Sequence, residues 1–191
     1  MTAGMPDQGS VSDFLLGFLV VEPTAKGDGF ISAVMVTDGR GYPLEFKATT
    51  PVRPSLVQKT LYGATLEKYV GIELCGKSLV RQLSRKPIAI LVPDRNLLDM
   101  APDVEPAVIA VWRPGEQLSV VGDDTGAHGT IKPPEGISQP LIYDGRFRDP
   151  TQQTDALRFV EDCSIRFDVV EAFDRMREAL KLLPKEDKRY A

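Results

Sequence analysis

The sequence holds few of the residues that zinc-dependent and triad enzymes use. It contains one histidine, His128, and two cysteines, Cys75 and Cys163. A zinc site needs several such ligands close together, and His128 lies in "GAHGT" with no other candidate ligand beside it. No Gly-x-Ser-x-Gly segment occurs, so a Ser-His-Asp triad is not indicated. We therefore expect an exposed His128, no bound metal and no cofactor.

The low cysteine content also bears on the cellular compartment. Two well-separated cysteines do not form a disulfide framework, which favours a reducing, cytoplasmic location. The apolar run "FLLGFLVV" at residues 14–21 is too short to cross a bilayer, and Asp13 precedes it rather than a basic segment. We interpret this run as a core strand and expect no membrane association.

Positive charge is not in excess either. The net charge is −4 and the pI is about 5.1, which argues against bulk, non-specific nucleic-acid binding. A small basic patch remains compatible with these values. No Gly-x-x-x-x-Gly-Lys-Ser/Thr segment is present, so a phosphate-binding P-loop is not indicated.

The first fifty residues predict a three-stranded antiparallel meander. The first strand is the nearly continuous apolar run at 14–22, as in a strand covered on both faces. "FISAVMVTD" at 30–38 predicts the second strand, and "DGRG" at 38–41 predicts a hairpin turn. The third strand, at 44–49, alternates apolar and polar residues.

A helical pattern follows from 55 to 84 and contains three glycines. We expect Gly63 to end a first short helix. Gly71 and Gly76 each cost about 1 kcal/mol relative to alanine in a helix interior, so something should offset them. Their spacing makes no phosphate loop. We therefore expect them to allow close packing of the helix on the sheet.

The rest of the chain divides by composition. Short apolar runs predict strands at 86–94 and at 107–112, and 117–121 is a further strand candidate. Asp168 and Glu171 resemble a capping box, and the apolar positions after them predict an amphipathic helix. The predicted organisation is a disordered N-terminus at 1–12, an α/β core domain at 13–121, a Gly/Pro-rich loop or linker at 122–140, and a C-terminal segment at 141–191 with a helix at about 168–183.

The order strand, strand, strand, helix, strand over about residues 13–115 is similar to that of the ribonuclease-H-like superfamily. The resemblance is one of topology. Active members need carboxylates that converge on two divalent metal ions. The resemblance places these in the middle of the first strand, on the helix and at the end of the fourth strand. Matching candidates are Glu22, Glu67 or Glu73, and Asp94, although Glu22 lies at the far end of its strand.

Two further patterns have both a functional and a plain interpretation. "DDTGA" at 123–127 resembles the Asp-Thr-Gly loop of aspartic proteases, but Gly122 and Asp123 stand where those enzymes have apolar residues, so a solvated turn is favoured. In "GRFRDP", Arg146 and Arg148 flank Phe147, which suits either base stacking or an exposed edge strand.

The main functional prediction is a non-catalytic protein-interaction module, a subunit of a larger cytoplasmic assembly. Its supports are the missing catalytic set and the amphipathic terminal helix. The alternatives are a divergent metal-dependent ribonuclease-H-like nuclease and a small-molecule sensor with a pocket near Tyr62 and Tyr69. Nucleic acid is a possible but less favoured partner. The predicted partner-binding residues are Phe173, Met176 and Leu180 on the terminal helix and the cationic stripe Lys77, Arg81 and Arg85.

Overall fold

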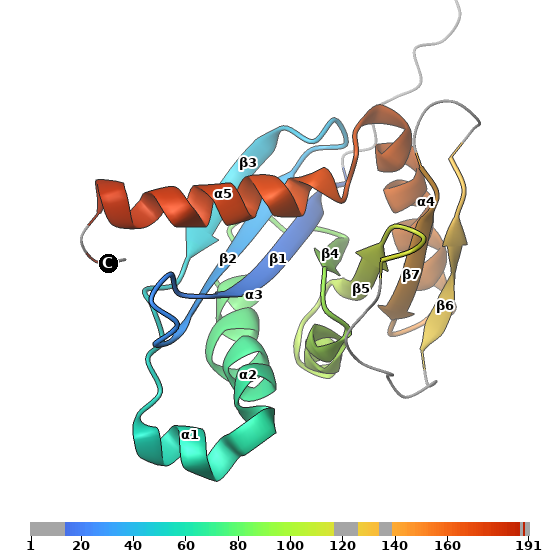
Figure 1. Ribbon diagram of the computed structural model, residues 1–191. Helices are drawn as coiled ribbons and strands as arrows, with labels where there is room; N and C mark the ends of the chain where they lie inside the picture. The colour runs from blue at the N-terminus through green and yellow to red at the C-terminus, as the bar shows by residue number, and fades with distance from the viewer. Residues whose placement is uncertain (1–13, 117–125, 134–138, 188, 190–191) are drawn as a thin grey trace, which may run out of the picture.

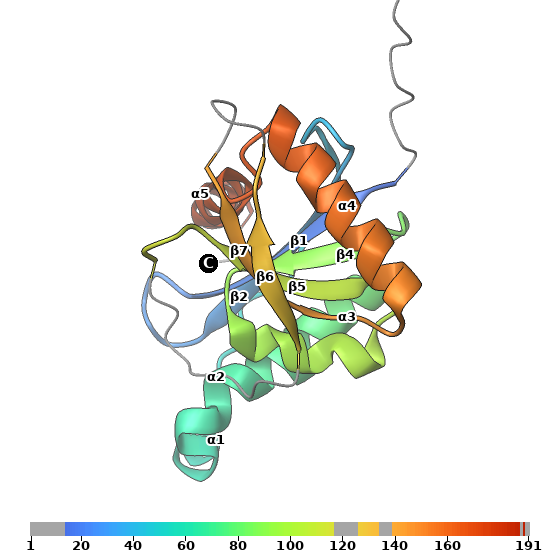
Figure 2. The ribbon, with the colours of Figure 1, turned by 90° about the vertical axis from the view of Figure 1, so that its right-hand side faces the viewer.

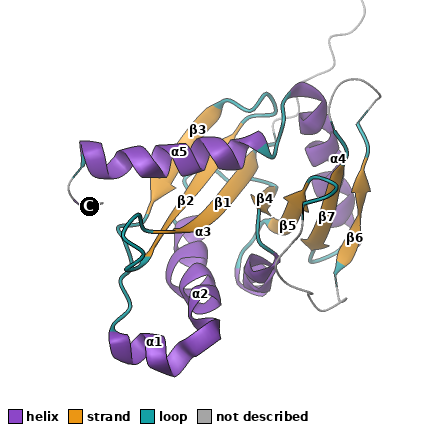
Figure 3. Ribbon diagram, viewed as in Figure 1, coloured by secondary structure: helices purple, strands orange, loops and turns teal. Residues whose placement is uncertain are grey.

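The computed structural model describes residues 14–116, 126–133, 139–187 and 189. The chain begins with three strands and ends with two helices, and Figure 3 distinguishes helices, strands and loops by colour. The strands are β1 (Leu16–Pro23), β2 (Phe30–Thr37), β3 (Pro43–Ala48), β4 (Ala89–Val92), β5 (Ala107–Trp112), β6 (Ala127–Ile131) and β7 (Leu141–Arg146). The helical elements are α1 (Leu56–Tyr62), η1 (Gly63–Thr65), α2 (Leu66–Tyr69), η2 (Val70–Gly76), α3 (Lys77–Arg81), η3 (Arg95–Asp103), α4 (Pro150–Arg166) and α5 (Glu171–Glu186).

The described strands form one mixed, seven-stranded sheet in the order β3-β2-β1-β4-β5-β7-β6 (Figure 1). β1, β2 and β3 are antiparallel, whereas β4 is parallel to β1 and β5 is parallel to β4. The predicted meander and the mixed α/β class are thus confirmed. The first five strands have the ribonuclease-H-like order.

Helices α4 and α5 cover one face of the sheet (Figures 1 and 2). Successive side chains of a strand point to opposite faces, so Phe18 and Val20 of β1 point toward this layer. Phe18 meets Phe173 of α5 edge to face, with ring centroids 5.7 Å apart. Phe159 of α4 and Met176 of α5 are buried in the same cluster.

The other face is covered by η2, α3 and η3. Leu19 of β1 is fully buried on this side and belongs to a second cluster with Ile72, Leu79 and Leu98. β1 is therefore buried on both faces, as its apolar run predicts. Helix α1 has no buried residue and projects from the body in both views (Figures 1 and 2).

The C-terminal third differs most from the prediction. Helix α4 is not predicted from the sequence, although Asp149 caps its N-terminus and Pro150 opens it. Strand β6 lies inside the segment interpreted as a linker, where it pairs with β7. Helix α5 continues through Pro184, because a proline near a helix end removes only one late hydrogen bond. The segments 1–12 and 117–121 lie outside the described residues.

The described helices include none that is long and apolar enough to span a membrane. The two cysteines, Cys75 and Cys163, are free and buried. Burial raises the pKa of both thiols, that of Cys163 to about 12. Neither thiol is therefore a reactive nucleophile in the folded chain.

The glycines have the structural role that the sequence predicts. Gly63 ends α1 with a φ of 50°. The next helix then widens into the π-helical segment η2, which begins at Val70 and ends at Gly76. A Cβ atom on Gly76 would lie 2.6 Å from the carbonyl oxygen of Gly71 and 3.1 Å from the sulfur of Met100. Only glycine fits there, because the backbone oxygen has nowhere to move.

We predict that Gly76→Ala lowers the free energy of unfolding by about 1–3 kcal/mol, the usual cost of overpacking a core. The matched control is Gly71→Ala, whose Cβ would meet the flexible ends of Leu97 at 3.0 Å and Val21 at 3.5 Å. These side chains have room to adjust, so its loss should be smaller. Urea denaturation of both variants provides the comparison. Equal losses would contradict this account of η2.

Candidate functional site

The place where the ribonuclease-H-like resemblance would put metal-binding carboxylates is apolar on β1. The β1 residues that face η2 and η3 are Leu19 and Val21, and both pack in the second cluster. Gly71 of η2 approaches them closely, since its added Cβ would lie 3.5 Å from Val21. An apolar interior disfavours ionised carboxylates, so this position belongs to the core.

The predicted acid of β1 lies on the opposite face. Glu22 follows the register of Phe18 and Val20 and pairs with Arg177 of α5, at 2.7 Å between Oε1 and Nε. Asp94, in contrast, caps the N-terminus of η3 by accepting the backbone N–H of Asn96 at 2.8 Å. Because η3 covers the other face of the sheet, Glu22 and Asp94 do not share a site.

The predicted helix carboxylates are also apart from these two acids. Glu67 is exposed on α2, and Glu73 pairs with Lys77 at 2.7 Å. Across the described ranges, no group of three or more His, Cys, Asp or Glu side chains could hold a metal ion. The donor set there does not fit the two-metal centre that the fold family implies.

The three predicted partner-binding residues of the terminal helix are buried. Phe173 and Met176 are 1% exposed and Leu180 is 4% exposed, all in the core between α5 and the sheet. The amphipathic helix thus packs on its own chain, and these side chains are not available to a partner. Lys77 is engaged by Glu73 and Asp103, each at 2.7 Å.

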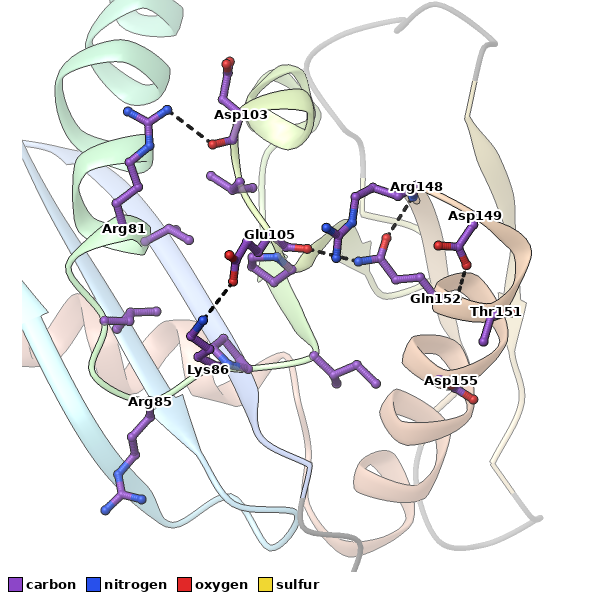
Figure 4. A pocket seen from close by; sticks show the side chains of 16 residues that line it. Arg81, Arg85, Lys86, Asp103, Glu105, Arg148, Asp149, Thr151, Gln152 and Asp155 are labelled. Atoms are coloured by element: carbon purple, nitrogen blue, oxygen red, sulfur yellow. Dashed lines mark hydrogen bonds and ion pairs between the residues drawn. The ribbon is translucent and has the colours of Figure 1, made fainter.

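A hollow lined by charged side chains lies between the end of α3 and the start of α4 (Figure 4). We call it the α3–α4 groove. It has a volume of about 870 Å³. Its cations are Arg81, Arg85, Lys86 and Arg148, its acids are Asp103, Glu105, Asp149 and Asp155, and Thr151 and Gln152 add polar groups.

Three of the four acids in the groove already have partners. A hydrogen bond from Lys77 lowers the pKa of Asp103, with 2.7 Å between the two groups. Glu105 pairs with Lys86 at 3.3 Å. Asp149 caps α4 by accepting the N–H of Gln152 at 2.8 Å. Asp149 and Asp155 make no ion pair in the described residues, and both keep a negative charge beside the remaining cations.

The arginines of the groove are less satisfied. Arg81 donates to the backbone oxygen of Asp103 at 3.3 Å. The guanidinium groups of Arg85 and Arg148 make no ion pair within the part of the chain that the structure describes. Helix α4, with 17 residues, also begins at the groove, and its N-terminal dipole favours negative charge. The groove lining holds as many acids as cations, so an anion would be bound by the guanidinium groups of Arg85 and Arg148 rather than by a net positive charge.

A second hollow continues the groove past Pro106, Arg148 and Gln152, which line both. It has a volume of about 540 Å³ and adds Arg146 of β7. Arg146 belongs to a buried ionic cluster. Asp144, whose side chain is 3% exposed, accepts from Arg146 at 2.5 Å and from Arg95 at 2.8 and 2.5 Å. One carboxylate between two guanidinium groups leaves a local excess of positive charge.

The other residues that the sequence singles out are placed as follows. His128 is exposed but lies on β6, opposite Asp144 in the ladder, rather than in a loop. Phe147 is partly buried against the first cluster and lines the second hollow. The Tyr62 and Tyr69 rings lie 4.4 Å apart, and their hydrogen bond raises the pKa of Tyr62. The 123–125 part of the Asp-Thr-Gly loop lies outside the described residues.

The groove brings together residues from two features that the sequence analysis treats separately, the helical stripe and the arginine pair around Phe147. Arg81 and Arg85 come from the predicted helical stripe, and Arg148 comes from the arginine pair around Phe147. The missed element is the start of α4, which supplies Thr151 and Gln152. The signal that could have found it is Asp149-Pro150, a helix cap followed by a proline at the first helical position.

No protein-family model and no curated protein matches this sequence. Solved structures with a similar fold include three endonuclease V proteins. That from Bacillus subtilis is 11% identical, with 88% of this chain and 82% of that chain covered and a TM-score of 0.47. The catalytic domain of the human protein is 15% identical, with 88% and 85% covered and a TM-score of 0.48. The protein from Ciona intestinalis, solved with DNA, is 10% identical, with 89% and 87% covered and a TM-score of 0.46.

These neighbours are nucleases. The comparison therefore contradicts the prediction of a non-catalytic protein-interaction module and agrees better with its alternative, a nuclease. At 10–15% identity the similarity concerns the fold, and it gives this chain no activity of its own.

We predict that Asp144→Ala lowers the free energy of unfolding by about 3 kcal/mol, because it leaves Arg95 and Arg146 without their shared carboxylate. Both arginines are about a fifth exposed, which keeps the loss at the low end for buried pairs. Asp174→Ala is the control. Asp174 pairs with Arg177 at the surface, and exposed pairs contribute about 0–1 kcal/mol. Similar denaturation midpoints for the two variants would contradict a structural role for the cluster.

Proposed function

We propose that this chain binds nucleic acid and that the α3–α4 groove receives the phosphate backbone. The observation that carries the proposal is the pair of arginines without ion-pair partners, Arg85 and Arg148, in a groove where α4 begins. Guanidinium groups bind phosphate through two parallel N–H donors.

The proposal fits the charge of the chain. A net charge of −4 opposes broad electrostatic binding, so the attraction should be confined to this groove. We expect modest affinity and few phosphate contacts. The free, buried cysteines agree with the further proposal of a cytoplasmic location.

The test is to replace the arginines and measure binding to a fluorescent oligonucleotide at several salt concentrations. Arg85→Ala and Arg148→Ala should each weaken binding several-fold. Each should also reduce the slope of log affinity against log salt by about one, because one phosphate contact is lost. The variants should unfold like the wild type, since both side chains are exposed.

The control is Lys181→Ala. Lys181 is an exposed cation on α5, paired with Glu178 and away from the groove. Its loss changes net charge by the same amount and should leave affinity and salt slope nearly unchanged. If Lys181→Ala weakens binding as much as Arg148→Ala does, binding is diffuse and the groove is not its site. Absence of binding by the wild type would reject the proposal.

A metal-dependent nuclease is the second candidate, since Asp94 lies at the end of β4, where the resemblance places a catalytic carboxylate. In this structure the carboxylate of Asp94 caps the N-terminus of η3. Cleavage of an oligonucleotide with Mg²⁺ or Mn²⁺ that Asp94→Asn abolishes, while binding persists, would support this candidate. Binding without cleavage would leave the groove as the functional feature.

A further inference from the structure

β3 is an edge strand of the described sheet, because β2 is its only paired neighbour there. The backbone N–H and C=O groups of successive β3 residues point alternately toward β2 and toward the open edge. The N–H of Thr49 donates to the carbonyl of Ser32 at 2.9 Å, so the backbone of Thr49 faces β2. Residues two apart face the same way, and the groups of Leu44, Phe46 and Ala48 therefore point outward.

The side chains of this edge are unusually apolar for an exposed position. Tyr42 is 64% exposed, Leu44 is 40% exposed and Phe46 is 38% exposed. Phe46 lies opposite Met35 of the first cluster and so shares its face of the sheet. Leu44 is two residues before Phe46 in β3, whereas Tyr42 precedes the strand, and the pairing with β2 is irregular between Val36 and Thr37. Helix α5 covers β1 and β2 on that face but leaves these side chains partly open. Natural proteins usually protect such an edge against pairing, so a partner strand is expected here.

We propose that β3 pairs antiparallel with β3 of a second copy of this chain, extending the sheet across a two-fold axis at Phe46. Phe46 then lies opposite its own counterpart, and Leu44 lies opposite Ala48. In the same register, Glu45 lies opposite Lys47 on the other face. The two chains place apolar side chains together on one face and opposite charges together on the other.

The charges select this register. A shift by two residues would place Glu45 opposite Glu45 in one direction and Lys47 opposite Lys47 in the other. Like charges directly opposite destabilise a pair of strands. A shift by one residue would place residues whose N–H and C=O groups point to the open edge opposite residues whose groups face β2. The two strands could then not form their hydrogen bonds. Of the registers centred on Glu45, Phe46 or Lys47, only the one centred on Phe46 thus satisfies both the backbone and the charges.

The same charges favour a second copy over an unrelated peptide. Glu45 and Lys47 of one chain lie 3.3 Å apart, so two chains would form a network of four alternating charges. The backbone N–H groups of Ser84 and Arg85 donate to Glu45 at 2.9–3.1 Å and hold it in place. These contacts and Lys47 lower the pKa of Glu45 more than burial raises it, so it stays ionised at neutral pH.

Disulfide cross-linking of single-cysteine variants tests the register. Phe46→Cys should form a covalent dimer under mild oxidation, because the two cysteines face each other across the axis. Leu44→Cys lies on the same strand and face but opposite Ala48, so it should cross-link much less. The native Cys75 and Cys163 are buried and do not interfere. Equal cross-linking of the two variants would overturn the register.

Light scattering after size exclusion, over a wide concentration range, tests the dimer itself. Leu44→Pro removes an outward N–H that the monomer does not use, so it should shift the wild-type dimer to monomer. Leu44→Thr removes the same apolar side chain but keeps the N–H, and it should retain more dimer. Unchanged thermal unfolding at low concentration would show that both variants fold. A wild type that stays monomeric throughout would reject the proposal, as would equal behaviour of the two variants.

Discussion

The arrangement of the molecule depends on a central strand that is buried on both faces. β1 lies between β2 and β4, and its side chains alternate between two apolar clusters. Burying apolar surface is the main favourable contribution to folding, and each cluster needs its own covering layer. This is why α4 and α5 occupy one side of the sheet and η2, α3 and η3 occupy the other.

The same constraint explains why the middle of β1 carries no carboxylate toward η2 and η3 in the described structure. A carboxylate at Leu19 or Val21 would replace core packing with a charge that needs compensation. The acid nearest in sequence, Glu22, instead lies at the strand end, where Arg177 neutralises it. Charged side chains thus lie at the periphery of the sheet rather than at its centre, and the α3–α4 groove lies there.

The sequence predicts the elements that have a clear apolar periodicity. It does not predict α4 and β6, whose local patterns are weaker. The alternation in β3 and the continuous apolar run of β1 are local signals, and both elements were predictable. α4 has a weaker apolar pattern, and β6 contains Gly129 within a Gly- and Pro-rich stretch, so composition alone suggests a linker. β6 is stabilised by its partner β7, which is a tertiary contact that single-sequence reasoning does not capture.

The candidate site could be predicted only in fragments, for a related reason. Arg81 and Arg148 are 67 residues apart in the sequence numbering, and neither carries a motif that links it to the other. Their convergence requires the crossing of the chain from α3 through β4 and β5 to β7. For Phe173 and Met176, the amphipathic pattern predicts that both side chains lie on the apolar face of a helix. It does not predict whether that face packs on the same chain, as the structure shows, or on a partner.

The groove and the β3 edge are connected by one side chain. Glu45 of β3 accepts the backbone N–H groups of Ser84 and Arg85, so it helps to fix the segment that carries an arginine of the groove. A dimer through β3 would therefore hold two grooves at a constant separation on one extended sheet. Two linked sites bind a long polyanion more tightly than either alone, because the second contact is intramolecular. An acidic chain whose groove offers two arginines without ion-pair partners would gain most from this arrangement, since pairing increases the effective contact without adding positive charge to either copy.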